Sequence, residues 1–170
     1  FRKFDTLNIS MGAGLLVYMA AKVFNKNGGD IDKTYEYLES IVNHITVLFV
    51  VDDLKYLARG GRISENKAKI GNIMQIKPVL TINDGEIDVF SKQNGSKKAI
   101  SFAVNELLCR YKNIDDAPIV VVNAACEDVA NLLVDKVKEH LPNVEVWTQP
   151  VGPVIGAHCG PRTCGIIFTS

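Results

Sequence analysis

Glycine and proline residues surround a single histidine between residues 151 and 165. Four glycines and two prolines in this stretch restrict the path of the backbone. Glycines also let the main chain approach a ligand closely and present its N–H groups. His158 can donate a hydrogen bond to a carboxylate near neutral pH. The pattern therefore fits an anionic head group, and it equally fits a structural crossover in which His158 caps a loop.

Two arginines flank a pair of glycines in the sequence Leu-Ala-Arg-Gly-Gly-Arg-Ile-Ser. Arginine forms bidentate pairs with carboxylates or phosphates, and the N-terminus of a helix attracts anions. For Arg59 the simpler interpretation is an ion pair with Asp52 or Asp53, or plain solvation. Arg62 lies inside the Gly-Gly-Arg turn, before an expected helix. Arg62 and the adjacent Gly61 are therefore candidates for a binding role.

Other patterns that could do chemistry receive less support. A Gly-Ala-Gly sequence at residues 12–14 resembles the start of a dinucleotide fingerprint, but Val17 stands where the third glycine belongs. Cys159 and Cys164 lie five residues apart, and no second cluster completes a tetrahedral metal site. A nucleophilic Cys159 beside His158 is poorly supported, because neighbours in a sequence often point apart. We expect neither a metal nor a cofactor.

The composition is that of a globular protein. Of the 170 residues, 47% are hydrophobic and 22% are charged, and 19 basic residues balance 19 acidic ones. This balance gives no electrostatic reason to expect a nucleic acid. The apolar runs are far shorter than the roughly 20 residues of a membrane helix, and no signal sequence opens the chain. We therefore expect a cytoplasmic protein, without a transmembrane segment, whose cysteines are free thiols.

The first half of the chain alternates between helical and strand patterns. Apolar residues recur at helical spacing over residues 12–24, and Asp30 or Asp32 can cap a second helix. Residues 45–51 are apolar and largely β-branched, which is typical of a strand buried on both faces of a parallel sheet. A further helix is expected over residues 65–74.

The second half begins with the strongest hairpin signal in the chain. Asn-Asp-Gly at residues 83–85 separates strands predicted over residues 79–82 and 86–90. Helices and strands then alternate, with boundaries set by the apolar periodicity and by turn residues. These elements are expected at residues 96–111, 118–122, 128–140, 144–148 and 165–169.

The alternation of helices and strands favours a layered α/β architecture, in which helices cover a mixed sheet. The break near Ile76-Lys77-Pro78 is the best candidate for a domain boundary. We therefore predict two three-layer α/β/α units, with residues 1–75 as the remainder of an N-terminal domain and residues 76–170 as a C-terminal domain. The first unit has too few strands to close its own sheet. We expect it to be incomplete in this chain and to pair with an upstream segment.

Taken together, these motifs resemble those of the DegV family. The similar segments are residues 49–64 with Gly-Gly-Arg, residues 76–80 followed by Asp-Gly-Glu at 84–86, and residues 152–161 with Gly-Ala-His-Cys-Gly-Pro. Residues 10–16, Ser-Met-Gly-Ala-Gly-Leu-Leu, also resemble a segment of that family. The resemblance spans nearly the whole chain in the right order. It implies two α/β domains with a fatty acid held between them, its carboxylate in a polar pocket and its tail in an apolar tunnel.

The resemblance also implies roles for individual residues. In this family the histidine of Gly-x-His-x-Gly-Pro helps to hold the carboxylate, and the arginine of Gly-Gly-Arg supports the polar site. The corresponding ligand-binding residues here are His158 and Arg62, with Gly61, Gly156 and Gly160. The family's other head-group contacts are hydroxyls from upstream motifs that this chain does not contain. The implied function is an intracellular carrier of a long-chain fatty acid, with no catalytic residue.

A partner protein is implied for some relatives. Those relatives present the acyl chain to a separate kinase that phosphorylates the carboxylate, and they carry an arginine just before a Lys-Lys-Ala helix start. Here residues 93–96 are Gln-Asn-Gly-Ser, so this arginine is absent near Asn94. A second departure is Arg162, which stands where a glycine usually follows Gly-Pro. The first departure weakens the inference of a kinase partner and leaves lipid binding untouched.

Two other functions are open on the sequence. One is an enzyme domain related to dihydroxyacetone-kinase-like folds, with His158 as base or nucleophile, although no ATP-binding motif appears. The other is a structural interaction module, in which both glycine-rich loops would tolerate substitution.

Overall fold

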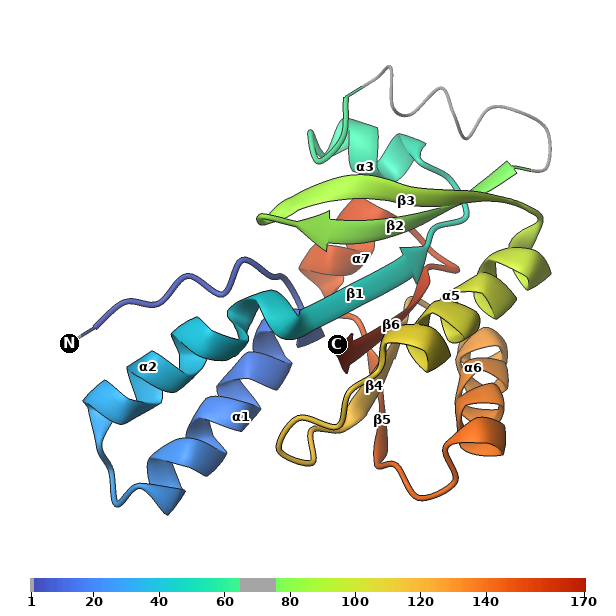
Figure 1. The fold of residues 1–170 in the computed structure, drawn as a ribbon. Helices are drawn as coiled ribbons and strands as arrows, with labels where there is room; N and C mark the ends of the chain where they lie inside the picture. Colours follow the sequence, from blue (N-terminus) through green and yellow to red (C-terminus); the bar gives the residue numbers. More distant parts are fainter. Residues whose placement is uncertain (1, 65–75) are drawn as a thin grey trace.

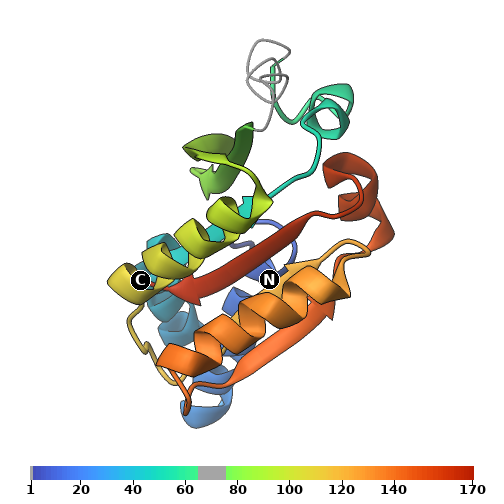
Figure 2. The same ribbon diagram turned by 90° about the vertical axis from the view of Figure 1, so that its right-hand side faces the viewer.

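A mixed sheet of six strands forms the centre of the molecule, with helices on both of its faces (Figures 1 and 2). The computed structural model describes residues 2–64 and 76–170, so the helix predicted at residues 65–74 lies outside the described residues. In sheet order the strands are β3 (Glu86–Asn94), β2 (Ile76–Asn83), β1 (Ile45–Val50), β6 (Cys164–Thr169), β4 (Ile119–Asn123) and β5 (Val146–Pro150). Strands β4 and β5 pair in parallel, and the other neighbours pair antiparallel.

The helices form two layers, which confirms the layered α/β architecture with a mixed sheet. In chain order they are α1 (Met11–Lys26), α2 (Ile31–Ile41), the short 3-10 helix η1 (Val42–His44), α3 (Lys55–Arg59), α5 (Ser96–Arg110), α6 (Glu127–His140) and α7 (Pro153–Cys159). Helices α5 and α6 pack on one face of the sheet. The other face carries α1 and α2 toward one end and the short helices α3 and α7 toward the other.

Alternating side chains on the central strands divide the core between these two faces. Leu48 of β1 and Phe168 of β6 pack with α5 and α6. Their neighbours Val47 and Ile167 face the opposite way, toward α1. A strand with an apolar cluster on each face has an almost continuous apolar sequence, which explains the run at residues 45–51.

Local signals explain several element boundaries. The carboxylate of Asp30 accepts a hydrogen bond from the backbone N–H of Lys33 at 3.1 Å and so caps α2. This bond lowers the pKa of Asp30. In the turn between β2 and β3, Asp84 and Gly85 both have positive φ, 48° and 80°. This is the hairpin geometry that an Asp-Gly pair favours, and it confirms the predicted hairpin.

The surroundings of β1 differ from the prediction. The sequence predicts a parallel strand that pairs with an upstream segment, whereas β1 pairs antiparallel with both β2 and β6. An apolar strand suits a central position in any sheet, and its own sequence does not specify its neighbours. The pairing crosses the boundary predicted between residues 1–75 and 76–170. The assignment of these two ranges to two domains stays a prediction.

Candidate functional site

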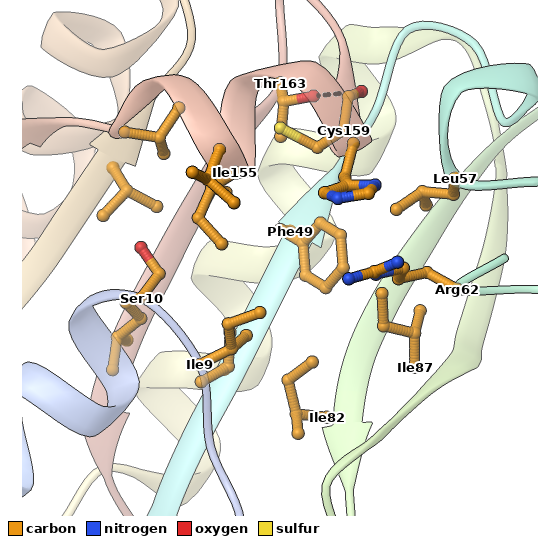
Figure 3. A pocket seen from close by; sticks show the side chains of 16 residues that line it. Ile9, Ser10, Phe49, Leu57, Arg62, Ile82, Ile87, Ile155, Cys159 and Thr163 are labelled. Carbon is orange, nitrogen blue, oxygen red and sulfur yellow. Dashed lines mark hydrogen bonds between the residues drawn. The ribbon is translucent and has the colours of Figure 1, made fainter. Parts of the chain in front are cut away.

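A pocket lies between the sheet face that carries α1 and the short helices at the end of that face (Figure 3). It encloses about 730 Å³ of empty space, part of which is open to solvent. Most of its wall is apolar and includes Phe49 of β1, Ile82 of β2 and Ile155 of α7. Among the described residues, the polar side chains in the wall are Ser10, Arg62, His158 and Thr163, together with the thiol of Cys159. The pocket therefore offers an apolar body with a few polar groups, as small-molecule sites commonly do.

Helix α7 carries His158, and the sequence analysis treated this segment only as a loop. Pro153 begins the helix, where its fixed φ and missing N–H are tolerated. Gly160 ends it with φ of 78°, and the backbone N–H of Gly160 donates to the Gly156 carbonyl at 2.8 Å. A proline at the start and a glycine at the end are a helix signal, which the density of glycines obscured.

The imidazole of His158 rests against the backbone of Gly60. A Cβ built on Gly60 would lie 2.1 Å from Nδ1 of His158, and 3.0 and 3.2 Å from the two ring atoms bonded to that nitrogen. Real Cβ atoms do not approach another heavy atom this closely, so a larger residue at position 60 would force the ring to move. The Gly-Gly-Arg turn and helix α7, which are far apart in sequence, are therefore in direct contact in the fold.

Arg62 reaches the pocket from the end of α3. The turn that follows this helix is closed by backbone bonds from Gly61 N–H to Ala58 and from Arg62 N–H to Leu57, both at 2.9 Å. Gly61 has φ of 69°, a conformation that suits glycine. The Arg62 guanidinium donates to the carbonyl oxygen of Gly60. Gly60 thus contacts both side chains that the sequence analysis singled out.

The glycines that were predicted to bind the ligand lie outside the pocket wall, unlike the two predicted side chains. His158 and Arg62 line the pocket, whereas Gly61, Gly156 and Gly160 are not among its wall residues in the part of the chain that the structure describes. Gly61 has open space beside it, and Gly156 is an interior residue of α7. Their roles in ligand binding stay predictions.

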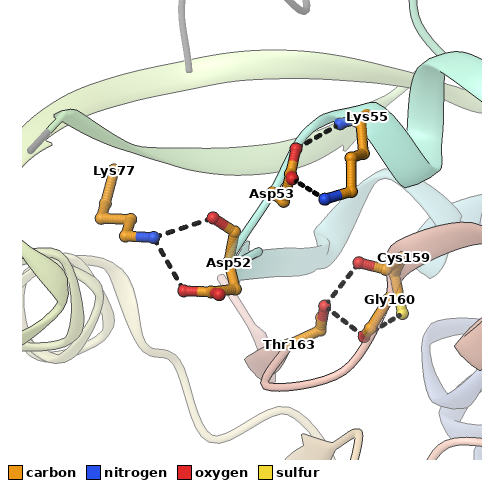
Figure 4. Close-up of polar contacts among 7 residues, drawn as sticks. All are labelled: Asp52, Asp53, Lys55, Lys77, Cys159, Gly160 and Thr163. Atoms are coloured by element: carbon orange, nitrogen blue, oxygen red, sulfur yellow. Dashed lines mark hydrogen bonds and ion pairs between the residues drawn. The ribbon is translucent and has the colours of Figure 1, made fainter. Parts of the chain in front are cut away.

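A second contact between an aromatic ring and a glycine joins α3 and α7. A Cβ built on Gly160 would lie 2.4 Å from the ring of Tyr56, so this tyrosine packs on α7 as His158 packs on the turn after α3. The Thr163 hydroxyl donates to the carbonyl oxygens of Cys159 and Gly160, at 2.9 and 3.0 Å (Figure 4). The contact between Tyr56 and Gly160 holds α7 against α3, and the Thr163 bonds brace the turn that follows α7.

The Cys159 thiol is a poor candidate nucleophile. Its side chain is buried, and burial raises the pKa of the thiol. A raised pKa reduces the population of thiolate, which is the reactive form. The thiols of all four cysteines are free, as the sequence predicted.

Ser10 is a wall residue that the sequence analysis did not select. It precedes α1 at the usual position of a capping serine, but its side chain makes no capping hydrogen bond and its φ is 54°. Figure 3 shows Ser10 across the pocket from Arg62. A serine before a helix is ordinarily interpreted as a cap, so its sequence position gives no sign of a pocket residue.

The two aspartates after β1 pair with lysines. Asp52 pairs with Lys77 at 2.8 Å, and Asp53 pairs with Lys55 (Figure 4). Neither aspartate pairs with Arg59 among the described residues, and Arg59 is exposed, which agrees with the alternative of plain solvation. The hydrogen bond from Lys55 lowers the pKa of Asp53. Within residues 2–64 and 76–170, no three His, Cys, Asp or Glu side chains gather as metal ligands would.

The structure combines an α/β fold with an apolar pocket whose wall includes a histidine and an arginine. The chain belongs to the DegV family, whose family model matches residues 1–170. A DegV domain-containing protein of Clostridium perfringens is 38% identical over 165 residues, which cover 96% of this chain and 56% of that protein. The chain thus spans a little over half the length of this relative.

Two solved structures illustrate the fold similarity. A fatty acid binding DegV family protein from Streptococcus agalactiae matches with a TM-score of 0.84 and 29% identity, over 99% of this chain and 60% of that one. The Fak B3 protein of the Streptococcus pneumoniae fatty acid kinase, loaded with linoleic acid, matches with a TM-score of 0.85 at 20% identity, over 98% and 58%. The second similarity concerns the fold alone.

No helix in the described part of the chain is both long enough and apolar enough to cross a membrane.

Proposed function

We propose that this chain forms part of a carrier for a long-chain fatty acid. The acyl tail occupies the apolar pocket, and the carboxylate lies at its polar side near His158 and Arg62. The observation that carries the proposal is the presence of these two donors in an otherwise largely apolar wall. The carrier acts in the cytoplasm, and it requires no cofactor because side chains alone can hold an acid of this kind.

The pocket wall suits an acyl tail. Its lining is mostly apolar, with Val47, Phe49 and Ile155 among the side chains. Each methylene that leaves water contributes about 0.8 kcal/mol, whatever its position along the tail. Such a wall retains acids of several lengths, because apolar contacts discriminate weakly between chains that differ by one methylene.

The polar side suits a carboxylate. An ionised carboxylate is expensive to remove from water unless cations or several donors converge on it. Arg62 is always charged, and its side chain is exposed at the pocket wall. His158 is only partly exposed and can supply a further hydrogen bond. The Ser10 hydroxyl makes no capping hydrogen bond and lies across the pocket from Arg62, away from the proposed position of the carboxylate.

A kinase that phosphorylates the bound acid is the proposed partner. Support comes from the family and from the shared fold with Fak B3 of a fatty acid kinase. The arginine that kinase-presenting relatives carry near position 94 is Asn94 here. Incubation of the loaded protein with such a kinase and ATP should yield an acyl phosphate. Absence of that product with an active kinase would remove the partner from the proposal and leave the carrier.

The first test of the carrier is the content of the purified protein. The intact natural protein that contains this chain should carry an acyl chain after purification, which native mass spectrometry and lipid extraction detect. Protein that is consistently empty, and that does not take up added palmitate, would contradict the proposal.

The second test separates the carboxylate from the tail. Substitutions His158→Ala and Arg62→Ala should each weaken palmitate binding by about 10- to 100-fold, since each removes a hydrogen bond to a charged group. Both should leave the binding of hexadecanol, which has the same tail and no carboxylate, within about threefold. His140→Ala and Arg59→Ala are matched controls outside the pocket wall and should leave both affinities unchanged.

A further inference from the structure

We propose that Gly60 is the positioning residue of the site: its bare Cα seats the imidazole of His158, and its carbonyl orients the guanidinium of Arg62. Gly60 does not itself line the pocket wall. It acts through His158 and Arg62, whose side chains line the wall. The part of this inference that concerns ligand affinity rests on the proposed function, whereas the part that concerns the imidazole does not.

The first argument is the approach of the ring to Gly60. The three atoms nearest to a Cβ built there are Nδ1 of His158 at 2.1 Å and its two bonded neighbours at 3.0 and 3.2 Å. This order of distances means that the Nδ1 corner of the ring points at Gly60. Nε2 lies on the other side of the ring, so Nε2 is the nitrogen left to face a ligand.

The second argument is that Gly60 has no conformational reason to be glycine. Its φ is −76° and its ψ is −4°, values that alanine adopts without strain. Other glycines of the site, Gly61 and Gly160, have positive φ and so meet a backbone requirement. At Gly60 the requirement is the space for the ring. A Gly60→Ala substitution therefore tests the contact with His158 and not the backbone.

The third argument is that Gly60 joins both polar side chains. Its carbonyl oxygen accepts the hydrogen bond from Arg62, and its Cα faces His158. The reciprocal contact between Tyr56 and Gly160 holds the same two segments together. Displacement of the ring by an added methyl group would therefore change the relation between the imidazole and the guanidinium.

The direct test uses the intact natural protein and needs no ligand. Gly60→Ala should shift the imidazole ¹H, ¹³C and ¹⁵N resonances of His158. The resonances of His44 and His140, which lie elsewhere, should not move. In the parent protein the ¹⁵N shifts should place the His158 proton, in the neutral ring, on Nε2. His158 resonances that do not change in Gly60→Ala would overturn the inference.

The matched control is Gly152→Ala. Gly152 precedes α7, has an ordinary φ of −65°, and has open space where a Cβ would lie. This variant should leave the His158 resonances unchanged. It should also bind palmitate within about twofold of the parent, whereas Gly60→Ala should bind about 10-fold or more weakly.

A double substitution shows whether Gly60 acts through the ring. With His158 present, Gly60→Ala should lower the midpoint of thermal unfolding by about 2–4 °C or more, because the methyl group overlaps the ring. In the His158→Ala background the same substitution should have little effect, since the ring that it displaces is gone. An equal loss in both backgrounds would overturn the inference.

The two proposals can fail separately. A protein that never binds palmitate, but whose His158 resonances respond to Gly60→Ala, would contradict the carrier function and support the positioning role. A protein that binds palmitate equally well with alanine at position 60, and whose His158 resonances do not move, would support the carrier and contradict the positioning role.

Discussion

The two faces of the sheet receive similar side chains from the same strands, yet the apolar pocket that contains His158 and Arg62 lies on one of them. On the face of α5 and α6, two long helices pack on buried residues such as Leu48 and Phe168. On the other face, α1 and α2 cover one part and the short α3 and α7 another, and the pocket lies between them. The length and position of the covering helices, and not the strands, decide which face has space for a ligand.

This comparison separates residues that maintain the fold from residues that maintain the pocket. Phe168 and Phe49 stand on neighbouring strands and point to opposite faces. Phe168 is fully buried, whereas Phe49 is half-buried at the pocket wall. Substitutions of the same type on the two faces should therefore have different consequences.

The largest expected difference is between Phe168→Ala and Phe49→Ala. Truncation of Phe168 leaves a cavity in a closed core and should lower the free energy of unfolding by about 3–5 kcal/mol. Truncation of Phe49 enlarges an existing pocket and should lower it by about 1–2 kcal/mol, mostly through lost burial. Urea unfolding followed by circular dichroism measures both values. Equal losses would show that the pocket face is as tightly packed as the other.

A smaller effect is expected from Gly165→Ala, which adds an atom to the pocket face. The new Cβ would lie 2.8 Å from Cβ of Phe49 and 3.1 Å from the Leu48 carbonyl oxygen. Relief of this overlap should cost about 1–3 kcal/mol and move the Phe49 ring. Urea unfolding measures the cost. Unchanged stability would mean that the sheet can shift locally to accept the methyl group.

The ion pair of Asp53 and Lys55, at the edge of the pocket face, should contribute less still. The lowered pKa of Asp53 means that its charged form stabilises the fold above the unfolded-state pKa of about 3.9. This contribution is lost as pH falls through the lower folded-state pKa. Because the Asp53 side chain is 37% exposed, solvent screening limits the effect of Asp53→Asn to less than about 1 kcal/mol.

The measurement for this pair is the free energy of unfolding of parent and Asp53→Asn as a function of pH. The two proteins should differ at neutral pH and converge in acid. Added salt should also reduce the difference. A difference that grows as the pH falls would contradict the assigned sign.

The smallest effect on stability is expected for exposed apolar residues of the two faces. Val154 of α7 is 69% exposed at the pocket, and Leu132 of α6 is 44% exposed on the opposite side of the sheet. Val154→Gln and Leu132→Gln should each change stability by about 0.5 kcal/mol or less. Only Val154→Gln should weaken palmitate binding, and a fluorescence or calorimetric titration of each variant checks this. Equal losses of affinity would contradict the location of the acyl tail.

Local signals allowed much of the fold to be predicted from sequence. The Asp-Gly turn and the cap at Asp30 act within a few residues, so their patterns are sufficient. The partners of β1 could not be predicted in this way, because the strand is apolar on both faces and its neighbours are distant in sequence. Helix α7 was missed because its glycines outweighed the signal from Pro153.

The sequence predicted the two polar side chains of the candidate site but not the residue that contacts both of them. His158 and Arg62 were selected from motifs, and both line the pocket. Gly60, which contacts both, was passed over in favour of Gly61, because no pattern in a sequence shows which of two adjacent glycines faces a distant ring. Ser10 was not selected, because a serine just before a helix gives no sign in the sequence of a pocket residue.

The place of β6 in the sheet has a consequence for the order in which the molecule assembles. This strand is the last of the described strands in sequence, yet it lies between β1 and β4 and pairs with both. During synthesis the hairpin of β2 and β3 can form beside β1, and β4 can meet β5, but the two halves join only when β6 has emerged from the ribosome. Helix α7, which carries His158, comes before this strand in the chain, so the pairing of β6 with β1 and β4 anchors the segment that brings the histidine to the pocket.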